Sequence, residues 1–436
     1  MASKNGYKAP KGRRAVVVSG VRTPFAKAFT DLTELDTIAL GSAAVAALLQ
    51  RTELPQNEID SVVWGGVILP PLTVNVGREI VLELKLPPEI EAHTVTRACA
   101  SGLQSITHAA SAIERGDADV VIAGGSDSTS NAPIAFPNKV VQKLGPLVLG
   151  GKGGPADYLG ALAQLMPLGD ILPRVPKVAE RTTGEVMGEA AERMAKRNEI
   201  SREAQDELAV RSHHRAARAH ATGRFDRELT KVQVGSDWVH TDNLVRADTS
   251  VEKLHKLRGA FAQDGTISAG NASPLTDGAA ATLIMSEEKA RALGFTPLAA
   301  IRTWSYVGVD PADQLLIGPA LCMPYALDKA GMALSDIDLV DVHEAFAAQV
   351  LSVLKALASP AFARERLGRD QAVGEIDIDK LNVHGGSIAI GHPFAATGAR
   401  MVTTMANELA LTGKSTALLG ICAAGGLGAA AILERV

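Results

Sequence analysis

The stretch Arg97-Ala98-Cys99-Ala100-Ser101-Gly102 (RACASG) is the point around which the chain is organised. A β-branched segment leads into it, and an apolar run with helical spacing, 103–113, follows it. Cys99 therefore lies where a strand passes into a helix, among residues small enough for a substrate to approach the backbone. The positive end of a helix dipole favours a thiolate. Cys99 is a candidate nucleophile, although a lone cysteine is also commonly a small apolar residue of the core.

Strands and helices alternate through the first part of the chain. Continuous β-branched or apolar runs predict buried strands, and apolar residues with helical spacing predict helices between them. The predicted strands are 14–19, 59–65 and 119–123, and the predicted helices are 36–49, 75–84 and 103–115. This alternation predicts an α/β fold with a mostly parallel sheet covered by helices on both faces.

The second half of the chain repeats this pattern. The sequence DIDLV at 336–340 resembles EIDSV at 58–62, and Gly391-His392-Pro393 precedes a helix as the segment around Cys99 does. The repeat predicts two similar domains related by a pseudo-two-fold axis. The helices that begin at Cys99 and near Thr397 would then meet at that axis, and their N-termini would favour a developing oxyanion.

Composition excludes several classes of function. The net charge is −4 over 436 residues, so the chain lacks the excess of basic residues that is typical of nucleic-acid-binding proteins. Three cysteines without paired spacing argue against a disulfide framework and indicate a reducing compartment. No apolar run reaches the roughly 20 residues that span a bilayer. The 41 glycines and the low aromatic content, 4%, indicate tight packing of helices on sheets.

The regular pattern breaks between 133 and 176. Within it, 144–173 is apolar and rich in Gly and Pro. It could pack on its own subunit, cover a substrate tunnel, contact a partner or lie on a membrane surface, and the sequence leaves these open. A strongly helical region, 182–222, with Ser201 as a predicted N-cap, and a segment rich in small polar residues, 265–281, follow.

Four clusters carry chemically competent side chains: Cys99, His343 in His343-Glu344-Ala345-Phe346, His392, and Cys422 in Cys422-Ala423-Ala424-Gly425-Gly426. Each follows a predicted strand or opens a predicted helix of the repeated unit. A single histidine is more often structural than catalytic. Two cysteines and two histidines at equivalent ends of a duplicated fold indicate one shared site.

The sequence resembles the thiolase family over nearly its whole length. The matching motifs are Cys-Ala-Ser-Gly at 99–102, Ala-Gly-Asn-Ala-Ser at 269–273, Asp-Gly-Ala-Ala at 277–280, Glu-Ala-Phe at 344–346, GSIAIGHPFAATG at 386–398, and Cys422 with its Gly-Gly-Leu-Gly. The resemblance implies a duplicated five-layer αβαβα fold with an inserted loop domain. The implied domains are 1–132 and its return segment 265–295, the inserted domain 133–264, and a C-terminal domain 296–436.

Within the family, the chain is most similar to the β-subunit branch of the fatty-acid-oxidation trifunctional complex, the 3-ketoacyl-CoA thiolases. Many thiolases have Asn before Glu-Ala-Phe, where this chain has His343, and Gly two residues after the last Cys, where it has Ala424. His343 is also a feature of that branch. The usual Asn holds a water in an oxyanion hole, and the resemblance implies that His343 takes its place.

The resemblance also implies roles for site residues. Cys99 would attack the 3-keto carbon of a 3-ketoacyl-CoA, His392 would accept its proton, and Cys422 would protonate the acetyl-CoA enolate that leaves. The backbone N–H groups of Cys99 and Ala424 would form an oxyanion hole. Coenzyme A would be a co-substrate bound by Met187, Arg246, Phe261, Ser273 and Phe346, without a resident metal or other cofactor.

The same resemblance implies partners and a location. We expect a homodimer, a heterotetramer with an α-subunit that carries hydratase and dehydrogenase activities, and a cytoplasmic protein. The apolar segment 144–176 would supply any peripheral contact with a membrane.

Three other functions remain open at this point. A biosynthetic acetyl-CoA acetyltransferase has the same catalytic set and runs the reversible reaction towards acetoacetyl-CoA. A decarboxylating ketosynthase shares the duplicated fold but does not need a cysteine at Cys422. A non-catalytic lipid carrier would not need Cys99, His392 and Cys422 together.

Overall fold

The computed structural model describes residues 12–151, 153–165, 172 and 179–436. The chain separates into two compact units, one formed by Met1–Asn131 with Ala179–Val436 and the other by Ala132–Val178. The expected inserted domain, 133–264, contains the second unit together with helices of the first. Its boundaries, and those of the other expected domains, stay predictions.

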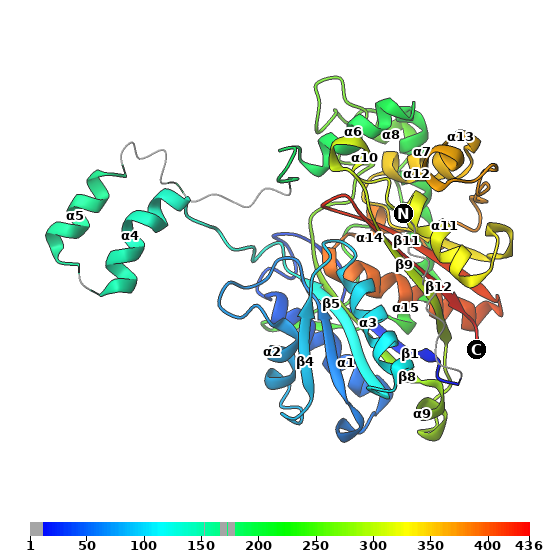
Figure 1. Ribbon diagram of the computed structural model, residues 1–436, viewed down its shortest axis with the longest axis horizontal. Coiled ribbons are helices and arrows are strands. Elements are labelled where there is room, and N and C mark those ends of the chain that lie inside the picture. The colour runs from blue at the N-terminus through cyan, green and yellow to red at the C-terminus, as the bar shows by residue number, and fades with distance from the viewer. Residues whose placement is uncertain (1–11, 152, 166–171, 173–178) are drawn as a thin grey trace. The chain divides into compact units, whose positions relative to one another are not determined.

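A ten-stranded sheet forms the centre of the larger unit, with strands in the order β10-β11-β12-β9-β1-β8-β5-β3-β4 and β2 paired separately with β8 (Figure 1). The strands are β1 Ala15–Arg22, β2 Ala26–Lys27, β3 Ser61–Gly65, β4 Glu91–Val95, β5 Val120–Asp127, β8 Thr276–Ser286, β9 Ala299–Gly308, β10 Leu339–Val342, β11 Thr416–Ala423 and β12 Leu427–Glu434. A separate hairpin pairs β6, Val232–Val234, with β7, Asp237–Val239.

The sheet is mixed, so the expectation of a mostly parallel sheet is wrong. Only β3 with β4, β3 with β5, and β10 with β11 run parallel among the described strands. The remaining pairs are antiparallel. Gly425 and Gly426, both with positive φ, make the tight turn that returns β12 alongside β11, and such a turn forces antiparallel pairing.

Strand pairing confirms the internal repeat. In the first half, β3 runs parallel to β5, which is antiparallel to β8, which is antiparallel to β1. In the second half, β10, β11, β12 and β9 follow the same sequence of orientations. The two halves join between β1 and β9, where Val16 pairs with Ala300 and Val17 with Ala299.

Helices cover the sheet and form the layer between the halves. The helices of the larger unit are α1 Thr37–Thr52, α2 Val76–Glu83, α3 Ser101–Arg115, α6 Met187–Arg197, α7 Arg202–Ala221, α8 Val251–His255, α9 Glu287–Ala292, α10 Pro311–Gln314, α11 Pro319–Ala330, α12 Ala347–Leu357, α13 Pro360–Phe362, α14 Ser387–Ile390 and α15 Phe394–Thr412. The predicted helical region 182–222 is two helices, α6 and α7, because Glu199 adopts a positive φ between them. Ser201 caps α7 by accepting from the N–H of Ala204, as expected.

The two equivalent helices α3 and α15 pack directly on each other (Figure 1). Their backbones approach so closely that a Cβ atom on Gly102 would overlap the carbonyl oxygen of Ala395. A Cβ atom on Gly398 would likewise overlap the backbone of Leu103. These glycines therefore set the spacing of the helix pair that carries Cys99 at one N-terminus and His392 at the other.

A buried ionic cluster ties the segment after α7 to β1. Arg22 donates to both carboxylate oxygens of Asp242, at 2.7 and 2.9 Å, and to Glu228 at 3.2 Å. His220 Nε2 lies 2.9 Å from Asp242, and the N–H of Phe25 donates to the same carboxylate at 2.8 Å. Burial alone would raise the pKa of Asp242, but the charge of Arg22 and these hydrogen bonds outweigh it and hold the pKa at about 2.

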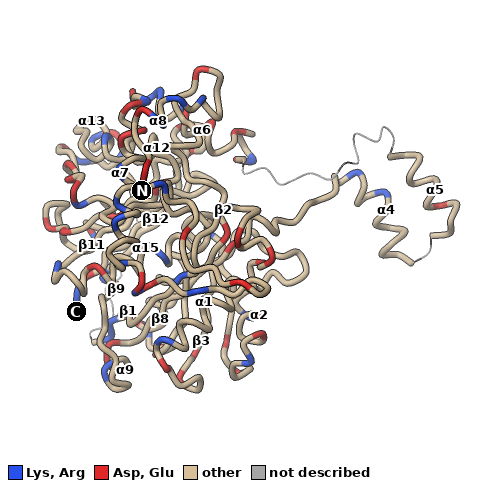
Figure 2. The backbone as a smooth tube through the Cα atoms, turned by 180° about the vertical axis from the view of Figure 1, so that it is seen from behind, with Lys and Arg blue, Asp and Glu red and all other residues tan. Residues whose placement is uncertain are grey.

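The second unit contains two helices, α4 Asn138–Gly150 and α5 Pro155–Ala163. Their charged residues are Lys139 and Lys143 on α4 and Asp157 on α5 (Figure 2). Large apolar side chains are exposed there, including Leu149 at 90% and Leu159 at 68%. Part of the expected contact segment 144–176 lies outside the described residues. In the part of the chain that the structure describes, no helix is long and apolar enough to cross a membrane.

We expect Gly102→Ala to lower the free energy of unfolding by about 1–3 kcal/mol, because the added methyl group must separate α3 from α15. Gly308→Ala is the matched control, since a Cβ atom there meets nothing within 4 Å. Urea unfolding followed by circular dichroism measures both. Equal stability of the two variants would contradict the close approach.

Acid should remove the contribution that Asp242 makes to the free energy of unfolding. A carboxylate whose pKa is lowered by folding stabilises the protein above its unfolded pKa of about 3.9, and this stabilisation is lost as the pH falls towards about 2. Asp242→Asn should lower the free energy of unfolding at pH 7 by about 3–5 kcal/mol and make its fall between pH 5 and pH 3 shallower. Urea unfolding over this pH range tests it, with the exposed Asp117→Asn as control. If the free energy of unfolding of Asp242→Asn depended on pH as steeply as that of the wild type, the pH dependence could not be assigned to Asp242.

Candidate active site

Cys99 lies in the turn between β4 and α3. Ser101 holds this turn, since its Oγ accepts from the N–H of Arg97 at 2.8 Å and donates to the carbonyl of Ala98 at 2.7 Å. Ala98 has a φ of 46°, a backbone conformation that is uncommon for a residue other than glycine. The turn thus places Cys99 just before the first turn of α3, which begins at Ser101.

Two buried histidines from the second half lie together. His343 follows β10 and His392 precedes α15, and their ring centroids are 4.2 Å apart. His392 Nδ1 lies 2.7 Å from Thr397 Oγ1, and His343 Nδ1 lies 3.1 Å from Ser387 Oγ. The Nε2 atoms of both rings are buried and have no hydrogen-bond partner among the described residues.

The structure brings these histidines to Cys99. The Cys99 thiol and one nitrogen of each ring all lie within 4.8 Å of one another. Cys422 lies in the same region, one residue before the end of β11; it is 1% exposed, and a charge on Cys99 would raise the pKa of its thiol. The four predicted catalytic residues are therefore neighbours, although they come from distant parts of the chain, at the ends of β4, β10 and β11 and at the start of α15.

Burial keeps the resting groups uncharged. It raises the pKa of the Cys99 thiol to about 11, against the opposing hydrogen bonds from the N–H groups of Ala424 and of Cys99 itself. Burial, with the charge of Arg400, lowers the pKa of His392 to about 3. Burial also raises the pKa of Cys422 well above its ordinary value. The helix N-terminus is expected to favour a thiolate at Cys99, but desolvation opposes the charge, and the pKa rises.

The backbone N–H groups expected to form an oxyanion hole face Cys99. The N–H groups of Cys99 and Ala424 both approach Cys99 Sγ closely enough to lower its pKa. Two fixed N–H groups at this point could stabilise a negative charge that develops on a bound carbonyl oxygen.

Four of the five residues expected to bind coenzyme A gather on one side of the site. The rings of Phe261 and Phe346 meet edge to face with centroids 6.0 Å apart, and Phe261 lies against Gly188, next to Met187. The N–H of Ser273 donates to Ala345, next to Phe346, at 2.9 Å. Arg246 lies apart on the surface, where its side chain donates to the carbonyl of Asn243 at 3.3 Å.

Four side chains behind the histidines were not expected from the sequence. Thr397 and Ser387 contact the Nδ1 atoms, and Arg400 donates to Ser387 and pairs with Asp341. A signal was available for Arg400, which is the only Arg or Lys in a long run of small and apolar residues, 394–412. Ser387 has no such signal, because only the fold places it beside His343.

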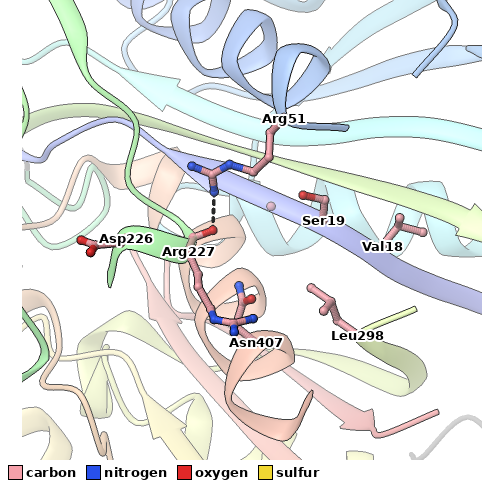
Figure 3. Close-up of a pocket in the computed structure, with 8 residues that line it drawn as sticks. Val18, Ser19, Arg51, Asp226, Arg227, Leu298 and Asn407 are labelled. Atoms are coloured by element: carbon pink, nitrogen blue, oxygen red, sulfur yellow. Dashed lines mark hydrogen bonds between the residues drawn. The ribbon is translucent and has the colours of Figure 1, made fainter. Parts of the chain in front are cut away.

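A cavity of about 320 Å³ lies away from these residues (Figure 3). Arg51 spans it and donates to the carbonyl groups of Arg227 and Leu229, and Asn407 of α15 closes one side. None of the expected catalytic or coenzyme-binding residues lines it.

The fold and site define a class of protein. The thiolase N-terminal domain model matches residues 15–288, and the thiolase C-terminal domain model matches residues 295–435. The chain belongs to the thiolase family.

Named relatives cover its full length. It is 45% identical to a 3-ketoacyl-CoA thiolase of Pseudoalteromonas translucida over 100% of both chains, and 46% identical to one of Yersinia pestis over 97% of both. Among solved structures, it is similar to the acetyl-CoA acetyltransferase of Bacillus anthracis (TM-score 0.83) and to human mitochondrial 3-ketoacyl-CoA thiolase (TM-score 0.82). Both are 32% identical and match 97% of this chain and 99% of theirs. The human enzyme is also known in complex with CoA.

The thiol and the two imidazoles also have the chemistry of a zinc site. Zinc takes sulfur at about 2.3 Å and nitrogen at about 2.0 Å, so its ligands lie about 3.5 Å apart, and shifts of about 1 Å would suffice here. The expectation that the protein holds no resident metal stays a prediction. An added zinc ion would occupy the same atoms that a substrate must reach.

We therefore expect Zn²⁺ to bind the purified chain and His343→Asn to weaken this binding at least about tenfold, since one nitrogen ligand is lost. Competition with a chromophoric chelator measures affinity without relying on activity. Removal of an exposed histidine, His240→Gln, is the control and should leave the affinity unchanged. If the wild type, His343→Asn and His240→Gln bound Zn²⁺ with equal affinity, His343 would not be a zinc ligand.

Proposed function

We propose that the protein is a 3-ketoacyl-CoA thiolase, an acyltransferase that cleaves a 3-ketoacyl-CoA with coenzyme A. The products are acetyl-CoA and an acyl-CoA shortened by two carbons. The observation that carries the proposal is the cluster in which the half-buried Cys99 faces two buried histidines with free Nε2 atoms, in a chain whose full-length relatives bear that name.

The first half of the reaction forms an acyl-enzyme. Because the pKa of Cys99 is raised to about 11, its thiol needs a base at the moment of attack. His392 supplies it: with Nδ1–H donating to Thr397, its Nε2 lone pair accepts the thiol proton. The Cys99 sulfur attacks the 3-keto carbon, and the N–H groups of Cys99 and Ala424, which face Cys99 Sγ, donate to the resulting oxyanion.

Carbon–carbon cleavage follows. The bond between C2 and C3 breaks, its electrons form the enolate of acetyl-CoA, and the thioester of Cys99 remains. The Cys422 thiol gives its proton to the enolate carbon, while the protonated His392 donates to the enolate oxygen, which was the thioester carbonyl oxygen.

The second half regenerates the enzyme. The Cys422 thiolate takes the proton of an incoming coenzyme A, and the coenzyme A sulfur attacks the thioester on Cys99. The Cys99 sulfur leaves and recovers its proton from His392. The raised pKa of Cys422 makes its thiolate a strong base that is formed only transiently.

Coenzyme A would lie along the apolar side of the site. Ser273 is placed to bond the pantetheine, and Met187, Phe261 and Phe346 supply the walls of its channel. Arg246 is exposed on the surface and would meet the nucleotide end.

The proposal includes partners and a location. We infer a homodimer that joins an α-subunit with hydratase and dehydrogenase activities in a cytoplasmic heterotetramer. The exposed apolar side chains of α4 and α5 support a contact of the second unit with that subunit or with a lipid surface, because such side chains are costly to leave in water.

A second candidate is an acetyl-CoA acetyltransferase that forms acetoacetyl-CoA. The fold similarity to the enzyme of Bacillus anthracis favours it, and the same four side chains would run the reaction in reverse. The two candidate functions differ in the length of the 3-ketoacyl-CoA that the enzyme would cleave.

Thiolysis of 3-ketoacyl-CoA substrates with four and with sixteen carbons tests the proposal. We expect loss of the 3-ketoacyl absorbance that requires coenzyme A and is faster with the long chain. Cys99→Ser should lower kcat at least about a thousandfold, since the oxygen nucleophile has no matched base. Cys322→Ala is the control, a buried cysteine whose Sγ donates to the carbonyl of Pro319 at 3.9 Å.

Activity confined to the four-carbon substrate would favour the acetyltransferase. Cleavage of neither substrate would reject both candidates and restore the condensing enzyme and the lipid carrier.

A further inference from the structure

A buried polar chain runs from Asp341 to His343. Arg400 Nη1 donates to Asp341 Oδ2 at 3.2 Å, and Arg400 Nη2 donates to Ser387 Oγ at 3.4 Å. Ser387 Oγ lies 3.1 Å from His343 Nδ1. All four residues are at most 1% exposed, so protein groups rather than bulk water set the direction of these hydrogen bonds.

The direction follows from the charge at one end. A guanidinium group can only donate, so Ser387 Oγ accepts from Arg400 and keeps its single proton for another partner. Among the described residues, the remaining partner of this hydroxyl is His343 Nδ1. A proton on Nδ1 would leave the buried hydroxyl without an acceptor, at a cost of about 1–3 kcal/mol. His343 Nδ1 therefore accepts.

We propose that Arg400 and Ser387 are positioning residues that fix His343 as its Nε2–H tautomer, so that this N–H donates, beside His392, to the thioester carbonyl oxygen that becomes the enolate oxygen. The inference rests on the proposed function and deepens it. His343 Nε2 is buried without a protein partner, which leaves its proton free for a substrate oxygen. His343 would thus supply by itself the hydrogen bond that the family's usual Asn supplies through a water.

The neighbouring His392 is held differently. Its Nδ1 faces the hydroxyl of Thr397, and no cation contacts that hydroxyl among the described residues. A hydroxyl without a cation behind it can donate or accept, so His392 can lose and regain a proton at Nε2. The two rings therefore have different roles: His343 is a fixed hydrogen-bond donor, and His392 takes up and releases a proton.

Electrostatics agree with this division. Burial and the charges of His392 and Arg400 lower the pKa of His343 well below its ordinary value. His343 thus stays neutral at working pH, and a neutral imidazole has a donor on one nitrogen only. Which nitrogen carries the proton decides whether the ring can donate into the site.

The first measurement is the ¹⁵N NMR spectrum of the full chain labelled at histidine, near neutral pH with a chelator present. The difference from His343→Asn identifies the His343 signals. We expect Nδ1 without a proton and Nε2 with one. The opposite pattern would overturn the proposal.

The second measurement is thiolysis by Ser387→Ala. Loss of one oxyanion donor costs about 10²–10³ in kcat, so a partly lost tautomer preference should cost about tenfold to a hundredfold. KM should change less than about twofold, because the donor acts on the developing charge. Ser387→Thr keeps the hydroxyl and should restore both the NMR pattern and most of kcat.

Ser305→Ala is the matched control, since Ser305 is an equally buried serine that donates to the carbonyl of Cys322 outside the site. It should change neither kcat nor the His343 signals, and thermal unfolding checks that each variant folds. A Ser387→Ala enzyme with unchanged tautomer and kcat would reject the proposal. Wild-type protein with the expected signals but no thiolysis would instead reject the proposed reaction and leave the tautomer assignment standing.

Discussion

The close approach of α3 and α15 is the constraint on which the rest of the site depends. Gly102 and Gly398 let the two backbones touch, and any side chain at either position would drive the helices apart. Cys99 lies just before one helix and His392 just before the other. A separation of even 1 Å would take the histidine nitrogens out of reach of the thiol, so helix packing sets the catalytic distance.

Burial then decides how the site can work. Removing these groups from water makes charge costly, and the thiols and imidazoles rest in their neutral forms. Each charge in the proposed cycle appears only during a step and next to a group that takes or balances it. The buried Arg400 is a permanent charge beneath this neutral cluster, and its pairing with Asp341 keeps that charge from being isolated.

Much of the fold was predictable from the sequence because the strands and helices of the repeat each have a local hydrophobic pattern. The strands around 14–19 and 59–65 and the helix after Cys99 follow from hydrophobic periodicity alone. Strand direction did not, because the long β8 returns from the insert and β12 returns through a glycine turn, and periodicity carries no direction. The thiol and imidazole neighbours were predictable from the motifs of the family. Their protonation was not, since desolvation is a property of the packed interior, and neither was Ser387, which meets His343 only after folding.

The duplicated scaffold and its single site have different symmetries. β3, β5, β8 and β1 are matched by β10, β11, β12 and β9, and α3 is matched by α15. The first copy nevertheless contributes one reactive side chain, Cys99, whereas the second contributes both histidines and Cys422. A symmetric frame thus encloses an asymmetric site, with Cys99 from one copy and the two histidines and Cys422 from the other. A molecule bound there meets different groups at its two ends, so the inequality of the two copies favours one orientation of a bound substrate.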